Sequence, residues 1–98
     1  MAAPVDIEWS LDALADLDRF AIFLHEHHPE IAAVVAETII DKAQVLSAFP
    51  KLGRAIAGRE EYRQLVLQVL NAPYVFQYRF DGSRLIILRI FHGREQRT

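Results

Sequence analysis

Apolar and polar residues alternate from Val5 to Trp9, which is the period of a half-buried strand. From Ser10 the period lengthens to that of an amphipathic helix, and Ser10 suits the N-cap because its hydroxyl can accept from a free backbone N–H. The helix is predicted to end at His28, since Pro29 disfavours helical geometry in the residue before it. Its inner stripe is expected to contain Leu14, Leu17, Phe20, Ala21 and Leu24, with Asp12, Asp16, Arg19 and Glu26 facing elsewhere.

A second helix is predicted from about Pro29 to Ala48, because proline suits the first helical turn and apolar residues recur at helical spacing after it. The tight connection at His28 and Pro29 implies two antiparallel helices. The inner face of the second helix is expected to hold Ile31, Val34 or Val35, Thr38, Ile39, Val45 and Leu46.

The stretch FPKLGRAIAGREE breaks this pattern with Pro50, Gly53 and Gly58, and is predicted to be a loop of about a dozen residues. Three strands are expected after it, separated by turns at Asn71-Ala72 and Asp81-Gly82. The second turn is a strong signal for a two-residue hairpin. The expected strands cover 62–70, 73–80 and 83–91.

The predicted order of elements is β-α-α-β-β-β, an α+β fold in which an N-terminal strand and an antiparallel helical hairpin precede a three-stranded antiparallel meander. Residues 1–98 are expected to form a single domain. The strands are apolar on both faces in places, and two helices cannot cover both, so an exposed apolar groove is predicted. In the middle strand, Tyr74, Phe76, Tyr78 and Phe80 should share one face and Val75, Gln77 and Arg79 the other.

Composition is that of a globular protein, with 52% hydrophobic and 24% charged residues. No apolar run approaches the roughly 18 residues that a membrane span requires. The first ten residues lack the basic start and long apolar stretch of a secretory signal, so a cytoplasmic location is expected. Cysteine is absent, which excludes disulfides and thiolate metal sites.

The HEHH stretch, residues 25–28, is the one segment that suggests a metal site. It lacks the i, i+4 histidine spacing that places two ligands on one helical face with a glutamate between them. Histidines in the last turn of a helix are explained by the negative end of the helix dipole. We therefore expect neither a metal nor another cofactor.

Charge is distributed unevenly along the chain. The formal net charge of −2 argues mildly against nucleic acid as the main partner. Residues 1–50 hold nine acidic side chains against Arg19 and Lys42, whereas residues 51–98 hold nine Lys and Arg against four acidic side chains. An anionic partner is therefore expected to meet the C-terminal half.

Four local patterns occur in a fixed order: an opening strand with SLDALADLDRFAIFL, the FPKLGR loop, YRQL with PYVFQYRF, and LRIFHGREQR. Together they resemble the RelE/ParE superfamily, the toxins of type II toxin–antitoxin modules, over about the whole chain. The resemblance implies the same fold and a toxin of the plasmid-stabilisation type. It also implies a hetero-oligomer with a cognate antitoxin, ParD-like or similar, whose C-terminal segment would wrap the toxin and fold in the groove as an amphipathic helix.

The superfamily contains two mechanisms, and the fold does not choose between them. In the RelE-like branch the toxin enters the ribosomal A site and cleaves mRNA with lysines at alternate positions of one strand, an arginine beside the next strand's tyrosine, and a C-terminal arginine and tyrosine. The corresponding strand positions are Leu67 and Val69, the position beside Tyr74 is Val75, and only Arg94 matches. Phosphodiester cleavage needs cations around the developing charge, so these apolar residues disfavour RNA cleavage.

In the ParE-like branch the toxin binds DNA gyrase and traps it in its DNA-cleaving state, without chemistry of its own. This role requires no catalytic set, so a gyrase-binding inhibitor is favoured over an enzyme. A ribosome-dependent mRNA endoribonuclease stays the alternative, because a His-Gly-Arg ending occurs in both branches and some ribosome-dependent relatives use a C-terminal histidine.

The C-terminal cluster of His92, Arg94 and Arg97 is the first group of candidate site residues. An imidazole titrates near neutrality and two guanidiniums can clamp a phosphate or carboxylate, while the alternative is a solvated tail. If the chain is a ribonuclease, His92 and Arg94 are the catalytic candidates. Candidates for contact with the target or antitoxin are Arg54, Arg63, Tyr78, Arg79, Arg89, His92, Arg94 and Arg97.

The candidates that precede this cluster each have a structural alternative. Arg79 and Arg89 either point toward an acidic partner or line a solvated face. Arg54 and Arg63 either close the same surface, since the permissive Gly53 lets the loop approach the sheet, or form ion pairs with the neighbouring residues Glu60 and Glu61.

Overall fold

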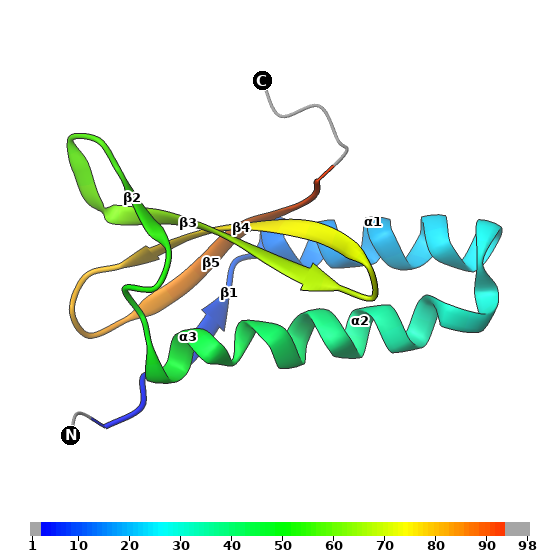
Figure 1. Ribbon diagram of the computed structural model, residues 1–98, viewed down its shortest axis with the longest axis horizontal. Coiled ribbons are helices and arrows are strands. Elements are labelled where there is room, and N and C mark those ends of the chain that lie inside the picture. The colour runs from blue at the N-terminus through cyan, green and yellow to red at the C-terminus, as the bar shows by residue number, and fades with distance from the viewer. Residues whose placement is uncertain (1–2, 94–98) are drawn as a thin grey trace.

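Eight elements follow one another along residues 3–93, which the computed structural model describes (Figure 1). The predicted α+β fold is confirmed, with an N-terminal strand and two long helices ahead of antiparallel strands. The elements are β1 (Ile7–Trp9), α1 (Leu11–His27), α2 (Pro29–Ala43), α3 (Val45–Ala48), β2 (Arg54–Ile56), β3 (Arg59–Val69), β4 (Ala72–Phe80) and β5 (Leu85–His92).

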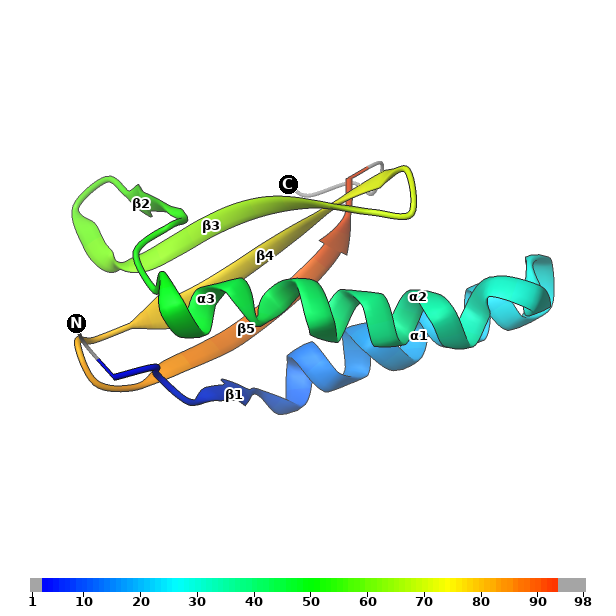
Figure 2. The ribbon, with the colours of Figure 1, turned by 60° about the horizontal axis from the view of Figure 1, so that its bottom comes forward.

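The strands form one sheet in the order β1-β5-β4-β3-β2. β1 runs parallel to β5, and the other neighbours are antiparallel. Helices α1 and α2 lie side by side across the same face of this sheet, with α1 against β5 and α2 against β3 (Figure 2). We call the opposite face, which carries Gln64, Val75 and Gln77, the open face.

The core lies between the helical hairpin and the sheet. On the middle strand β4, Tyr74, Phe76 and Tyr78 are buried as the alternation predicts, and Phe80 is partly buried against them. The other buried apolar residues of this cluster are Ala13, Phe20, Val35, Ile39, Ala43, Leu46, Val69, Leu85, Ile87 and Ile90.

The helices differ from the prediction in several details, and Ile31 of α2, which was expected on the inner face, is exposed. Leu14 is exposed, because the stripe that faces the sheet passes through Ala13 and Leu17 instead. The second helix does not run unbroken to Ala48. The amide of Gln44 donates to the carbonyls of Asp41 and Lys42, which ends α2 and leaves α3 as a separate short turn.

The predicted loop over residues 49–61 is wrong in its second half. It contains the short strand β2 and the first residues of β3, with Arg54 opposite Gln64 and Ala55 opposite Arg63. The charged run at the start of β3 hides the alternation that marks a strand, and pairing with β2 and β4 overrides this local pattern.

Both hairpin turns also differ from the prediction. The turn between β3 and β4 is formed by Leu70 and Asn71, whose φ angles of 49° and 72° are the left-handed values of a two-residue hairpin. The turn after β4 is longer than two residues. Asp81 Oδ1 accepts from the backbone N–H groups of Ser83 and Arg84, and these bonds lower the pKa of Asp81 to about 2.

Candidate partner-binding site

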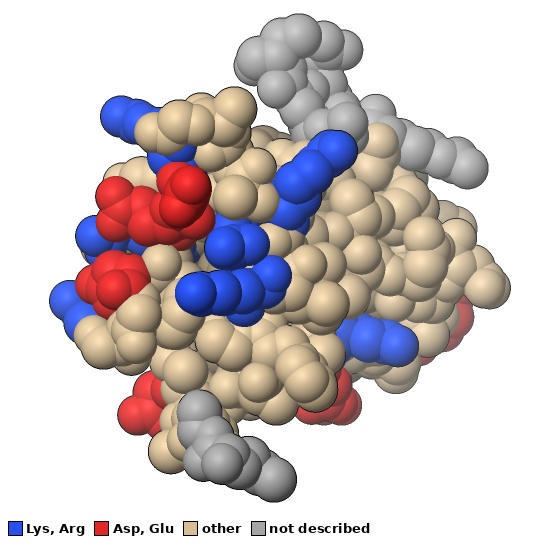
Figure 3. All heavy atoms as spheres, turned by 60° about the vertical axis from the view of Figure 1, so that its left-hand side comes forward, with Lys and Arg blue, Asp and Glu red and all other residues tan. Residues whose placement is uncertain are grey.

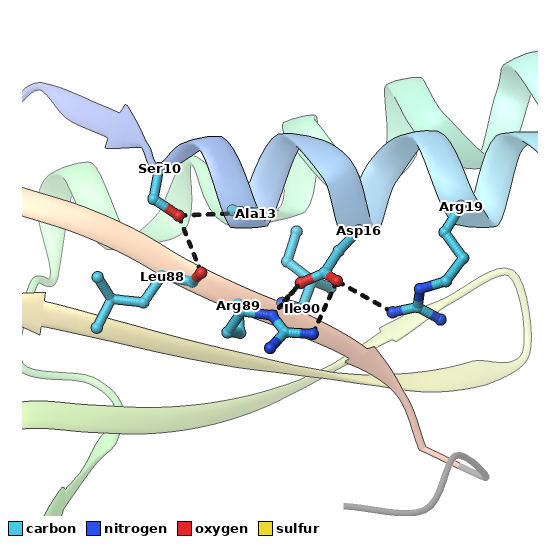
Figure 4. Close-up of polar contacts among 7 residues, drawn as sticks. All are labelled: Ser10, Ala13, Asp16, Arg19, Leu88, Arg89 and Ile90. Carbon is cyan, nitrogen blue, oxygen red and sulfur yellow. Dashed lines mark hydrogen bonds and ion pairs between the residues drawn. The ribbon is translucent and has the colours of Figure 1, made fainter.

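The first turns of α1 lie beside the edge of β5 and supply hydrogen-bond partners for its backbone (Figure 4). Beyond the last β1 pair, the Ser10 amide donates to the Ile87 carbonyl at 3.0 Å, and Ser10 Oγ donates to the Leu88 carbonyl at 2.9 Å. Asp16 Oδ2 then accepts from the Ile90 amide at 2.8 Å. Ser10 also caps α1, since its Oγ accepts from a backbone amide of the first turn. Side chains of α1 thus satisfy an edge that β1 is too short to cover.

Asp16 holds two arginines on one carboxylate. Arg89 donates from Nε to Oδ2 at 2.8 Å and from Nη2 to Oδ1 at 3.1 Å, and Arg19 Nη2 donates to the same Oδ1 at 3.1 Å. Burial favours a raised pKa for Asp16, but the hydrogen bonds from Arg89, the Ile90 amide and Arg19 outweigh it and hold the pKa below its usual value. Asp16 is only 3% exposed, so the prediction that it faces away from the core is wrong.

Arg89 therefore has an acidic partner inside the chain. Its guanidinium also lies over the Phe91 ring, 4.8 Å from the ring centroid. The Arg89 and Arg19 side chains keep 42% and 44% of their surface exposed, although Asp16 beneath them is buried. The two guanidinium groups thus lie partly exposed at the surface.

An apolar groove of about 710 Å³ opens between the helical hairpin and the turn that joins β3 to β4. An exposed apolar groove is thus present, but the reason given for it is wrong, because the groove lies between the helices and the sheet and not on the face that the helices leave uncovered. Three basic or titratable side chains, Arg19, His28 and His92, lie among its lining residues. The apolar lining consists of Phe20, Phe23, Leu24, Ile31, Val35, Val69, Leu70, Ala72 and Tyr74.

His92 lies at this groove and belongs to an aromatic row. Its ring meets Tyr74 edge to face with centroids 5.1 Å apart, and Tyr74 meets Phe20 in the same way at 5.3 Å. The backbone of the next residue, Gly93, is held by a bond from its amide to the Pro73 carbonyl at 2.7 Å. The imidazole is thus fixed beside an apolar surface, at the point where the chain leaves the sheet.

Tyr78 has a different environment from the one expected of a contact residue. The side chain is fully buried, and its hydroxyl donates to the Pro50 carbonyl at 2.8 Å and accepts from the Gly53 amide at 2.9 Å. Burial raises the pKa of Tyr78. Arg63 fastens the same loop by donating to the carbonyls of Lys51 at 3.2 Å and Gly53 at 2.7 Å. Both side chains thus hold the loop on the sheet.

Arg79 lies in ion pairs with acidic neighbours, to Glu61 at 2.6 Å and to Asp81 at 3.5 Å. Arg54 is exposed on β2, opposite Gln64. Seen from the end of the molecule with the β2–β3 and β4–β5 connections, Lys and Arg side chains gather in the middle of the surface with Asp and Glu side chains beside them (Figure 3). This end of the sheet therefore carries a mixed charge pattern.

The structure divides the predicted site residues into two groups. His92 lies opposite Tyr74, while Arg63 lies opposite Tyr78, about 13 Å further along β4. Arg89 belongs with His92 at the groove end, and Arg54, Arg79 and Tyr78 belong with Arg63. Arg94 and Arg97 lie outside the described residues.

The sequence did not indicate that Asp16 and the tip of the helical hairpin contribute to the site. Asp16 stands in the stretch SLDALADLDRFAIFL, which is part of the resemblance to the superfamily, and the structure explains its place there. Ser10 and Asp16 bind the edge of β5, and Ala13 between them is fully buried. Phe23 gave no signal, because an apolar residue of an amphipathic helix is expected to face the core.

The sequence matches the profile of the ParE toxin of type II toxin–antitoxin systems, parDE, over residues 7–97. The chain belongs to this family. Ser10, Asp16 and the groove thus lie in a toxin of a ParDE/RelE-type toxin–antitoxin system, within the RelE/ParE superfamily.

Two relatives from Caulobacter vibrioides carry the names of both branches. The toxin RelE1 is 31% identical over 88 residues, which cover 90% of this chain and 92% of RelE1. The toxin ParE3 is 34% identical over 80 residues, which cover 81% of this chain and 77% of ParE3. The chromosomal ParDE system of P. aeruginosa contains a chain of the same fold, with a TM-score of 0.73, 22% identity and coverage of 93% of this chain and 98% of that one.

No helix between residues 3 and 93 is long and apolar enough to cross a membrane. Within the same range, no three His, Asp or Glu side chains are close enough together to hold a metal ion.

Proposed function

We propose that this ParE-family toxin acts by binding DNA gyrase, and that a cognate antitoxin neutralises it by occupying the apolar groove. One observation carries the choice of target. Two positions that correspond to cations of the RelE-like branch, Val69 and Val75, are 1% and 3% exposed, and the third, Leu67, packs against the core. No cation stands at these places to stabilise a phosphorane.

The loss of these cations matters because a ribonuclease must stabilise charge that develops on the phosphate. Fixed donors in such a site typically contribute several kcal/mol each to the transition state. A toxin that acts by binding needs none of them. An accessible surface with anchoring side chains is sufficient, and the groove with the exposed Arg89 and Arg19 guanidiniums supplies one.

The alternative is a ribosome-dependent mRNA endonuclease, and one observation favours it. His92 is held beside Tyr74 at the rim of the groove, where an imidazole can act as a general base toward a bound nucleotide. The relative named RelE1 is consistent with this alternative.

The target is tested by inducing the chain without antitoxin in bacteria and following pulse-labelled DNA and protein synthesis over the first minutes. We expect DNA synthesis to fall first, with gyrase-linked strand breaks. His92→Ala should retain toxicity to within about threefold, because gyrase binding uses no general base. In a ribonuclease, loss of the general base would typically lower the cleavage rate 10²-fold or more. An early fall in protein synthesis with cut mRNA, abolished by His92→Ala, would replace gyrase with the ribosome.

Antitoxin binding is tested at the groove wall. Phe23 is 56% exposed and lines the groove, whereas its neighbour Ile22 is 61% exposed and does not. We expect Phe23→Glu to weaken binding of the cognate antitoxin by about 30-fold or more, as loss of a buried aromatic anchor does. Calorimetry on the purified chain measures this.

Ile22→Glu is the matched control, because it adds the same charge to the same helix. It should change the affinity less than threefold. Equal effects of the two substitutions would mean that the antitoxin recognises the outer surface of α1 and not the groove.

A further inference from the structure

The segment between α3 and β2 carries two large apolar side chains at the surface. Phe49 is 62% exposed and Leu52 is 50% exposed. They are the two corners of one turn, since the Leu52 amide donates to the Phe49 carbonyl at 3.0 Å. Such a turn places its corner Cα atoms less than about 7 Å apart. We call residues 49–52 the FPKL turn, and its two exposed apolar residues lie close together.

Hydrogen bonds hold the backbone of the FPKL turn in place. The Phe49 amide donates to a carbonyl of α3 at 3.0 Å. The Pro50 carbonyl accepts from the Tyr78 hydroxyl, and the Lys51 carbonyl accepts from Arg63. Proline at the second position of the turn also fixes the backbone, because its φ angle is already set. The turn therefore presents its side chains on a backbone that is ordered before any partner binds.

The apolar side chains of the FPKL turn have no role in the core. Among the described residues, neither Phe49 nor Leu52 belongs to the core cluster or packs against it. Large apolar side chains that enter a pocket of a partner carry much of the binding free energy of a protein interface. Holding them in the bound arrangement beforehand lowers the entropy that is lost on binding. The FPKL turn has both properties of a protein-binding site.

Positive charge surrounds the FPKL turn. Lys51 in the turn and Arg54 after it are both exposed, and Arg63 adds a third cation because its guanidinium group bonds to the carbonyls of Lys51 and Gly53. Between residues 3 and 93, none of the three cations forms an ion pair with an acidic side chain. The surface at the turn is therefore positive, although the chain has a net charge of −2.

The FPKL turn and the groove lie at opposite ends of the sheet. The described lining of the groove includes Tyr74 and His92 but no residue from 49 to 54. Figure 1 shows the segment between α3 and β2 on the left, and the turn that joins β3 to β4, which borders the groove, on the right. A partner that fills only the groove therefore leaves the FPKL turn exposed.

The chemistry of the FPKL turn indicates its partner. A second copy of this chain does not fit, because a symmetric contact would bring the same three cations face to face. Nucleic acid is a poorer match, since Leu52 offers neither a donor to a phosphate nor a ring to a base. A protein surface that has an apolar pocket bordered by carboxylates matches both the apolar residues and the cations.

We propose that the FPKL turn binds such a surface on the toxin's target, as a second contact in addition to the groove. This inference rests on the proposed function, in which the target is gyrase and the antitoxin occupies the groove. Because only the groove is shared by the two partners, substitutions in the turn should weaken inhibition of the target and leave antitoxin binding unchanged.

The test compares Phe49→Ala/Leu52→Ala with the control Leu11→Ala/Ile40→Ala. The control residues are 84% and 41% exposed and do not line the groove. Inhibition of supercoiling by purified gyrase should require at least tenfold more of the turn variant than of the parent chain, as expected for the loss of apolar anchors. The control should change this concentration less than threefold. Calorimetry should show cognate antitoxin affinities within threefold of the parent for both variants.

A charge reversal tests the cations separately. Lys51→Glu should raise the half-inhibitory concentration at least about fivefold, because it places a negative charge opposite the carboxylates of the target. Lys42→Glu is the matched control, since Lys42 is exposed on α2 and the change in net charge is the same. It should have less than a twofold effect.

The outcomes separate this inference from the proposed function. If the parent and the turn variant inhibit gyrase equally, the FPKL turn is not a target contact and the proposed function stands. If the turn variant binds the antitoxin at least tenfold more weakly, the turn belongs to the antitoxin site and this inference is wrong. If the parent chain does not inhibit gyrase, both proposals fail. If Phe49→Ala/Leu52→Ala does not fold, Lys51→Glu decides.

Discussion

Replacing Asp16 with alanine should lower the midpoint of thermal unfolding by about 10–20 °C. The carboxylate accepts from Arg89, Arg19 and the Ile90 amide, and Asp16 is almost fully buried. Its loss leaves the Ile90 N–H without an acceptor and removes the tie between α1 and β5. A buried, charge-assisted network of this kind contributes about 2–4 kcal/mol, and a domain of this size loses about 4–8 °C per kcal/mol.

Asp18→Ala is the matched control, because Asp18 is an exposed residue of the same helix. It should change the free energy of unfolding by less than about 0.5 kcal/mol. Differential scanning calorimetry of both variants measures the difference. A shift of only 1–2 °C for Asp16→Ala would show that the two arginines contribute no net stability through this carboxylate.

Asp16 also makes the free energy of unfolding depend on pH in the acid range. The pKa of Asp16 is lowered in the folded chain, so the carboxylate binds protons less readily there than in the unfolded chain. Its contribution is fully present above the unfolded pKa of about 3.9 and is lost as pH falls through the lower folded value. Below about pH 4, Asp16→Asn should therefore lose stability less steeply than the parent chain in urea titrations at successive pH values.

The order of elements could be predicted because apolar residues follow clear periods in both helices and in β4 and β5. The start of β3 could not be predicted, because consecutive charged residues hide the alternation of apolar and polar positions. Some of these charged side chains face solvent, and others form ion pairs with the neighbouring strand. Arg79, for example, takes Glu61 of that run as its partner. Only the sheet pairing, which is not local in sequence, brings these two residues together.

The candidate site could be predicted only in part for a related reason. A groove was predicted because the strands carry more apolar side chains than two helices can cover. Its position could not be predicted, since it depends on how the helical hairpin crosses the sheet. Tyr78 was a contact candidate only because it stands beside Arg79. Its alternation with Tyr74 and Phe76 placed it on the buried side of β4, and the structure buries it beneath the loop. Buried polar residues such as Asp16 carry no periodic signal, since their partners lie more than 70 positions away.

Gly53→Ala should destabilise the chain by about 2–3 kcal/mol, although alanine is ordinarily neutral or stabilising in place of glycine. A Cβ at Gly53 would lie 2.8 Å from the Tyr78 ring and hydroxyl and 2.9 Å from the Gln64 carbonyl oxygen. Neither neighbour can withdraw easily. Tyr78 is fully buried, and its hydroxyl both donates and accepts a hydrogen bond. The Gln64 carbonyl is part of a backbone that is paired within the sheet.

Denaturant unfolding of Gly53→Ala, Tyr78→Phe, the double variant Gly53→Ala/Tyr78→Phe and the control Gly58→Ala measures this. Gly58 meets no atom within 4 Å, so its alanine variant suffers only the cost of a φ of 76°, about 1 kcal/mol. Removal of the Tyr78 hydroxyl relieves one overlap, so the double variant should lose less than the sum of its single changes. Simple additivity would instead mean that the loop moves away from the sheet at little cost. In that case Arg63, which holds the same loop through its carbonyls, would be its main attachment.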